Sequence, residues 1–139
     1  MSGEDEVRQA SQQFYAALNR MASGDSSAMA DVWSHGVGVT AMHPIGGRDV
    51  GWDAVKGSFE QVAKAASAGS VELTDQLIRV AGDTAYELGV ERGHVTLGGH
   101  RAAIDHRVTN IYQRQRGAWK LIHHHTDTSP EMLEILGRL

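Results

Sequence analysis

The last third of the chain constrains the fold most, because it reads as two extended segments joined by a tight turn. Residues 107–115 and 118–127 flank Arg116-Gly117, and the second segment ends in His123-His124-His125-Thr126-Asp127. Side chains alternate between the two faces of a strand. The alternation predicts one face made of Trp119, Leu121, His123, His125 and Asp127, and an opposite face made of Lys120, Ile122, His124 and Thr126. Along the first face the side chains change from apolar to polar, as expected of a strand that forms the bottom of a pocket.

The residues at the end of this strand could have several chemical roles. His123 and His125 could act as an acid/base pair, donate hydrogen bonds or chelate a metal, and they could equally be structural supports. Arg107 and Thr109 share a face of the preceding strand, and a buried guanidinium needs a carboxylate or an anionic ligand. Glu91 or Asp127 could supply that carboxylate, so both a structural ion pair and an anion site remain open. No cysteine is present to complete a closed zinc site, and we expect neither a metal nor a cofactor.

Composition narrows the class of protein. The 139 residues suit a single domain spanning 1–139. The net charge is −4, whereas a nucleic-acid binder usually has a basic surface. The start, Met1-Ser2-Gly3-Glu4-Asp5-Glu6, is acidic where a signal peptide is basic, and no segment approaches membrane-spanning length. We therefore expect a cytoplasmic protein with no nucleic-acid or membrane partner.

The period of the apolar residues changes near Gly69. Before it, helical spacing predicts a long helix from Ser2 to Gly24, a short one after Asp25 and a third over 52–66, with a strand over 37–43 that ends before Pro44. After it, strands are predicted over 71–80, 84–97 and 100–113, with Gly89 and Gly93 as bulges or bends, and a last helix opens at Ser129-Pro130. Helices followed by antiparallel strands indicate an α+β fold in which helices cover one face of a curved sheet.

These motifs resemble one known superfamily. The His43-Pro44 strand end, the helix start Gly51-Trp52-Asp53-Ala54-Val55, the run Arg107-Val108-Thr109 and the segment from Trp119 to His125 resemble the SnoaL-like branch of the nuclear transport factor 2 superfamily. That branch includes bacterial relatives of the calcium/calmodulin-dependent kinase II association domain. The resemblance implies a cone, with a curved antiparallel sheet wrapped around the N-terminal helices, a pocket between them and a dimer through the outer sheet face.

The resemblance also suggests which residues meet a small-molecule ligand. Catalytic members, such as ketosteroid isomerase and scytalone dehydratase, move protons with pocket Asp, His or Tyr side chains. The candidate catalytic residues of this chain are His125, Asp127, His123 and Tyr15. The candidate substrate-binding residues are Arg107, Thr109, Trp33, His43, Trp52, Phe59 and Trp119, of which the aromatic ones could equally be plain core.

Two functions from different classes follow. One is an acid/base enzyme, such as an isomerase, dehydratase, cyclase or hydrolase, acting on a compact apolar substrate. The other is a non-catalytic oligomerising or ligand-sensing domain that binds a small carboxylate or hydrophobe through Arg107. In either case we expect a homodimer through an outer sheet face assigned by alternation to Val108, Asn110, Tyr112, Ile122 and His124.

Overall fold

The computed structural model describes residues 2–139. Its helices are α1 (Gly3–Met21), α2 (Met29–Val32), α3 (Trp52–Ala65) and α4 (Pro130–Gly137). Its strands are β1 (Thr40–His43), β2 (Gly46–Val50), β3 (Ala66–Ala81), β4 (Thr84–Leu97), β5 (His100–Gln115) and β6 (Ala118–Thr126). The α+β prediction is confirmed.

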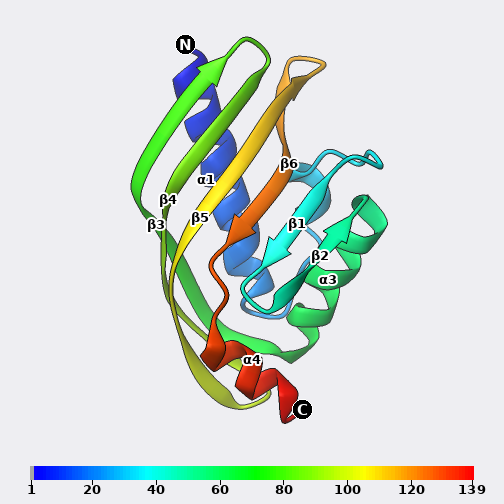
Figure 1. Ribbon diagram of the computed structural model, residues 1–139, viewed down its shortest axis with the longest axis vertical. Helices are drawn as coiled ribbons and strands as arrows, with labels where there is room; N and C mark the ends of the chain where they lie inside the picture. The colour runs from blue at the N-terminus through cyan, green and yellow to red at the C-terminus, as the bar shows by residue number, and fades with distance from the viewer. Residues whose placement is uncertain (1) are drawn as a thin grey trace.

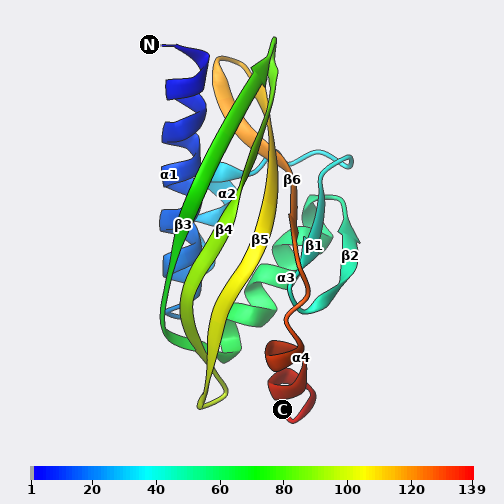
Figure 2. The same cartoon turned by 60° about the vertical axis from the view of Figure 1, so that its left-hand side comes forward.

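All the strands belong to one curved sheet in the order β2-β1-β6-β5-β4-β3. Neighbouring strands are antiparallel except β1 and β6, which run parallel. Figures 1 and 2 show α1 along the concave face of the long strands, α3 beside β1 and β2, and α4 at the end of the sheet where the C-terminus lies. The predicted cone of sheet around N-terminal helices is therefore present. None of the helices in residues 2–139 is both long enough and apolar enough to cross a membrane.

Local sequence explains why α1 lies where it does. The Ser2 side chain accepts a hydrogen bond from the Asp5 backbone N–H at 3.1 Å, which caps the first turn. Val7, Phe14 and Leu18 then fall on one stripe of the helix and are buried against the sheet. The same face carries Tyr15 toward the interior.

Bulges in β3 curve the sheet. Its pairing with β4 shifts register between Ser67 and Ser70 and again between Thr74 and Leu77. The two glycines of β4 face these irregularities. A Cβ on Gly93 would lie 1.8 Å from the Ser70 carbonyl oxygen, and one on Gly89 would lie 2.6 Å from Leu73 Cδ1. The glycines were predicted to be bulges or bends, and the structure shows that they make room for bulges in the neighbouring strand β3.

A bulge in β6 overturns the face assignment of the final strand. Ile111 of β5 pairs with His123, but the next residue, Tyr112, pairs with Leu121, so Ile122 is an extra residue. One extra residue exchanges the two faces beyond it. Trp119 and Leu121 lie on the concave face as predicted, but beyond the bulge His124 and Thr126 lie there too. The prediction that His123 and His125 share a face with Trp119 and Leu121 is wrong.

The predicted outer face of the sheet also differs from the structure. Val108, Asn110, Tyr112 and His124 are buried on the concave side, so their assignment to the outer face is wrong. The convex face instead carries exposed apolar side chains on β3 and β4. Leu77, Tyr86 and Leu88 are 40%, 45% and 37% exposed, and Leu77 pairs directly with Leu88.

One strand and one strand pairing near β1 were not predicted. Residues 46–50, which include the expected Gly46-Gly47 loop, form β2 and return antiparallel along β1. Gly46 and Gly47 adopt φ values of +88° and +77°, which favour glycine. The parallel pairing of β1 with β6 brings Met42 opposite His125 in register.

Candidate functional site

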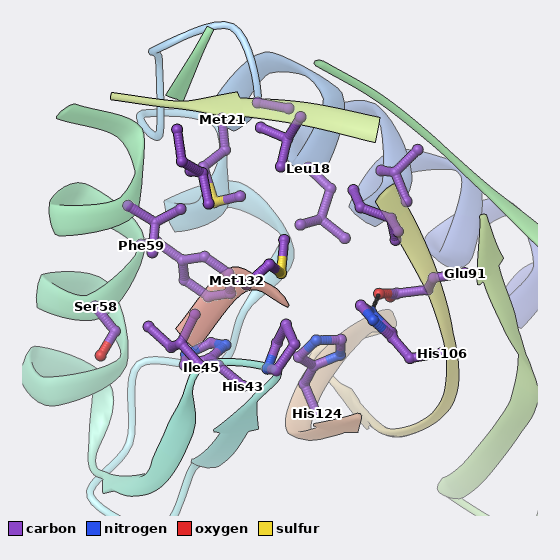
Figure 3. Close-up of a pocket in the computed structure, with 17 residues that line it drawn as sticks. Leu18, Met21, His43, Ile45, Ser58, Phe59, Glu91, His106, His124 and Met132 are labelled. Carbon is purple, nitrogen blue, oxygen red and sulfur yellow. Dashed lines mark hydrogen bonds and ion pairs between the residues drawn. The ribbon is translucent and has the colours of Figure 1, made fainter. Parts of the chain in front are cut away.

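A cavity of about 70 Å³ lies between the concave face of the sheet and helices α1, α3 and α4. Figure 3 shows side chains from all these elements converging on it. Most of the wall is apolar and comprises Leu18, Met21, Ala22, Pro44, Ile45, Phe59, Val62, Val71, Val95, Leu97, Ile104 and Met132. The polar part comprises His43, Ser58, Glu91, His106 and His124. An enclosed apolar space with a few converging polar groups is the usual form of a small-molecule site.

Glu91 and His106 form a buried hydrogen-bonded pair in this wall. Nε2 of His106 lies 2.7 Å from Oε1 of Glu91, and each side chain is only 5% exposed. The other oxygen, Oε2, accepts the Tyr15 hydroxyl at 2.9 Å. Because an ionised carboxylate only accepts hydrogen bonds, His106 donates from Nε2. Its Nδ1 is then the ring nitrogen left to exchange a proton, and no residue of 2–139 forms a hydrogen bond to it.

The environment of Glu91 favours its charged form. Burial alone would raise the pKa of this carboxyl group, but the hydrogen bond from His106, the nearby His124 and the Tyr15 hydroxyl together bring the pKa below its ordinary value. Burial, followed by the charge of Glu91, raises the pKa of Tyr15. Tyr15 is therefore a neutral donor that holds Glu91 in place.

A second hydrogen-bonded chain sets the tautomer of His124. Nδ2 of Asn110 donates to the Tyr15 hydroxyl oxygen at 3.1 Å and to Oε1 of Glu87 at 3.0 Å. Glu87 is fully buried and also accepts from Tyr112 at 2.9 Å. With its amide nitrogen committed in this way, Asn110 presents Oδ1 to Nδ1 of His124, 2.6 Å away. His124 must then carry its proton on Nδ1, and Nε2 keeps a lone pair.

Burial favours the neutral forms of His124 and His43. It lowers the pKa of His124 to about 3, because the charged ring would lose its hydration, although Glu91 partly opposes this effect. Burial also lowers the pKa of His43, against the opposing effect of Asp49. Nε2 of His43 lies 3.3 Å from Oδ2 of Asp49, yet the alignment is too poor for a hydrogen bond within residues 2–139. Ser58 donates to the same carboxylate oxygen.

The structure brings some of the predicted site residues to this cavity. His43 and Phe59 line it, and Tyr15 adjoins it through Glu91. Trp33 is fully buried beside Phe59, with ring centroids 5.9 Å apart, and so belongs to the core behind the wall. Trp52 stacks on His35 away from the cavity at 4.5 Å.

The other predicted residues lie elsewhere. Trp119 is buried and donates to Glu6 at 3.2 Å, near the start of α1. A groove on the convex face is lined by Arg107, Thr109, His125 and Asp127. His123, which bonds Thr40 at 2.7 Å, shares that face. These five residues are not part of the inner cavity, chiefly because the β6 bulge exchanges the faces of the strand.

Arg107 satisfies one of the two predicted alternatives. Its Nε and Nη2 donate to the two oxygens of Asp127 at 2.9 and 3.0 Å, with the guanidinium largely exposed. The Arg107 hydrogen bonds lower the pKa of Asp127 to about 2. The pair is thus a surface contact that fixes the chain after β6, and the guanidinium is not buried.

Sequence reasoning missed most of the inner polar residues. Glu91, His106, His124, Asn110 and Glu87 all lie on the concave face. A signal was present, because Glu87 and Glu91 alternate in register with the apolar Ala85 and Val95. Polar residues in phase with a core-facing pattern need buried partners, which makes them candidates for a site.

Metal ligation is not supported in the described part of the chain. No group of three or more histidine, cysteine, aspartate or glutamate side chains in residues 2–139 is placed to hold an ion.

Comparison with known proteins identifies the family. The family model of the SnoaL-like domain matches residues 7–128, and the chain therefore belongs to the SnoaL-like domain family. No curated protein matches the chain significantly.

Solved structures with the nuclear transport factor 2-like fold are similar over most of their length. A candidate dehydratase of the NTF2-like family from Streptomyces avermitilis is 26% identical, with a TM-score of 0.79 over 91% of this chain and 95% of its own. A candidate calcium/calmodulin-dependent protein kinase type II association domain from Thiobacillus denitrificans is 25% identical, with a TM-score of 0.70 over 88% and 94%. An NTF2-like superfamily protein from Salmonella enterica reaches a TM-score of 0.80 at 14% identity, over 90% and 89%.

Proposed function

We propose that the protein binds a compact, largely apolar small molecule in the inner cavity and transfers a proton to or from it through His106. The observation that carries this proposal is the Glu91–His106 pair in an otherwise apolar wall, with N–O separation of 2.7 Å. A carboxylate that binds one ring nitrogen fixes the tautomer and orientation of a histidine, which is how acid/base histidines are commonly held. Isomerisation and dehydration are reactions that need one such group.

The similarity to a candidate dehydratase at 26% identity gives independent support for this class of chemistry. The roles first assigned to His125, Asp127 and His123 pass in this proposal to His106 and His124, because those two residues line the cavity. Tyr15 keeps a part as the donor that positions Glu91.

Proton transfer can be tested before the natural substrate is known. Cyclic ketones and hydroxyketones of five or six carbons would be incubated in D₂O with the protein, and loss of the carbon-bound proton signal would be followed by NMR. We expect exchange with at least one of them, and a loss of about 10²- to 10⁴-fold in His106→Gln, the range for removal of a general acid/base. The matched control is His125→Gln on the convex face, which should keep the rate.

A non-catalytic, ligand-sensing domain is the second candidate. It is favoured by the lowered pKa values of His124 and His43, because neutral rings that protonate only in acid are poor proton carriers at neutral pH. Binding of the same ketones without any exchange of their protons would select this function and reject the enzyme.

We also propose a homodimer through the convex face. Leu77, Tyr86 and Leu88 form exposed apolar surface there, and burial against a second copy would remove it from water. Light scattering at micromolar concentration should give twice the mass of the chain, and Leu88→Lys should shift it toward the monomer. Val50→Lys alters an exposed apolar residue on edge strand β2 and should leave the dimer intact. A monomeric parent protein would contradict the proposal.

A further inference from the structure

The charges around the inner cavity restrict what it can hold. Among the described residues that line it, none is lysine or arginine, and the ionisable ones are Glu91, His43, His106 and His124. Glu91 already accepts hydrogen bonds from His106 and Tyr15. Arg107, the only cation first considered for an anionic ligand, is on the convex face and bound to Asp127. A carboxylate in the cavity would meet another carboxylate and no free cation, which is strongly unfavourable away from water.

The hydrogen-bond directions restrict the ligand further. The buried carboxylates Glu87 and Glu91 accept hydrogen bonds that hold Asn110 and Tyr15 in place. Asn110 in turn places the His124 proton on Nδ1. No residue of 2–139 donates to Nε2 of His124, so this lone pair is left for a ligand. Figure 3 shows the His124 ring beside that of His43 at the edge of the cavity. A group that satisfies Nε2 must itself donate a hydrogen bond.

The size of the space sets an upper limit on the ligand. About 70 Å³ is roughly half of an engineered cavity of about 150 Å³ that admits benzene. Met21 of α1 and Met132 of α4 both point into the space in Figure 3. Their unbranched side chains can repack at low cost, so a modest rearrangement of these side chains would make room for a single ring.

We propose, on the basis of the proposed function, that the ligand of this cavity is an uncharged alcohol or phenol of about one ring, whose hydroxyl group donates to Nε2 of His124. The apolar remainder of the molecule packs against Phe59, Met21 and Met132. Carboxylates are excluded by Glu91 and by the lack of a cation in the wall. This replaces the small carboxylate that was considered when Arg107 was expected to face the pocket.

Three single-ring ligands test the proposal, of which phenol and toluene are matched in size. Phenol, toluene and benzoate would be titrated at pH 7 and followed by NMR of the protein. Phenol should bind with a dissociation constant at least tenfold lower than that of toluene, and benzoate should not bind. His124→Phe should bind phenol and toluene equally, whereas His125→Phe, which changes the neighbouring residue on the convex face, should keep the preference.

A second measurement on the unaltered protein avoids the risk that His124→Phe fails to fold. The ¹⁵N resonance of His124 Nε2 should move toward the hydrogen-bonded range with phenol and stay in place with toluene. Equal binding of phenol and toluene, or binding of benzoate as tight as that of phenol, would overturn the inference while leaving the cavity as a ligand site. If none of the three binds, the inference is overturned, and the proton exchange of the cyclic ketones decides the proposed function separately.

Discussion

The two faces of the sheet carry similar residue types and put them to different uses. On the convex face, Arg107 and Asp127 form an exposed pair that holds the chain after β6. On the concave face, Glu91 and His106 form a pair that is almost wholly removed from water. Burial is the difference, since charges in water interact weakly and those in the interior strongly. Chemistry is therefore expected where ionisable groups are enclosed by apolar side chains.

Three consecutive histidines show the same difference between the two faces. His123 and His125 lie toward the convex side, while His124 lies between them and is 2% exposed on the concave side. One extra residue, Ile122, decides which of them reaches the cavity. A candidate site cannot be assigned from alternation alone when a strand contains a bulge.

The largest expected effect is the loss of the inner pair. Glu91→Leu leaves His106 and Tyr15 without their buried acceptor, and we expect the free energy of unfolding to fall by about 3–5 kcal/mol. Chemical denaturation measures this directly. Asp105→Leu, which removes the carboxylate of an exposed pair with Arg92, should leave the midpoint nearly unchanged. Similar losses for both variants would mean that Glu91 is not held in a dry interior.

A pH dependence of stability should follow from His124. Its pKa is about 3 in the folded state against 6.5 for an ordinary histidine. Between these two pH values the unfolded chain therefore binds a proton that the folded protein does not bind. The contribution is complete above about pH 6.5 and is lost progressively as the pH falls toward 3. The melting temperature should fall between pH 7 and pH 4, and His124→Phe should make that fall shallower. An unchanged pH profile in His124→Phe would show that His124 is not excluded from water.

The fold was more predictable from sequence than the site. Apolar residues at helical spacing in α1 and α3, and the turns at Gly82 and Gly98-Gly99, are local signals, and the elements they predict are present. The site depends on contacts between distant residues, such as Tyr15 with Glu91, and on single-residue register shifts. Neither leaves a local pattern. The short strand β2 escaped detection because two of its five residues are glycines.

The smallest effect is expected on the convex face. Arg107→Ala removes both hydrogen bonds to Asp127, but the guanidinium is 82% exposed and water can replace Asp127. The melting temperature at moderate salt and the binding of phenol should both stay within experimental error. A clear loss of phenol binding would return Arg107 to the ligand site and reverse the assignment of the two faces.

The protonation state of His124 tests the central difference between the faces most directly. Two-bond ¹H–¹⁵N correlation spectra of the imidazole rings, recorded from pH 8 to pH 5, report which nitrogen carries the proton. We predict that His124 stays neutral throughout, with the proton on Nδ1 and a bare Nε2. A positively charged ring above pH 5 would contradict the account, because His124 would then lie in contact with water. A proton on Nε2 would contradict it too, because Asn110 would then not be the acceptor of the His124 proton.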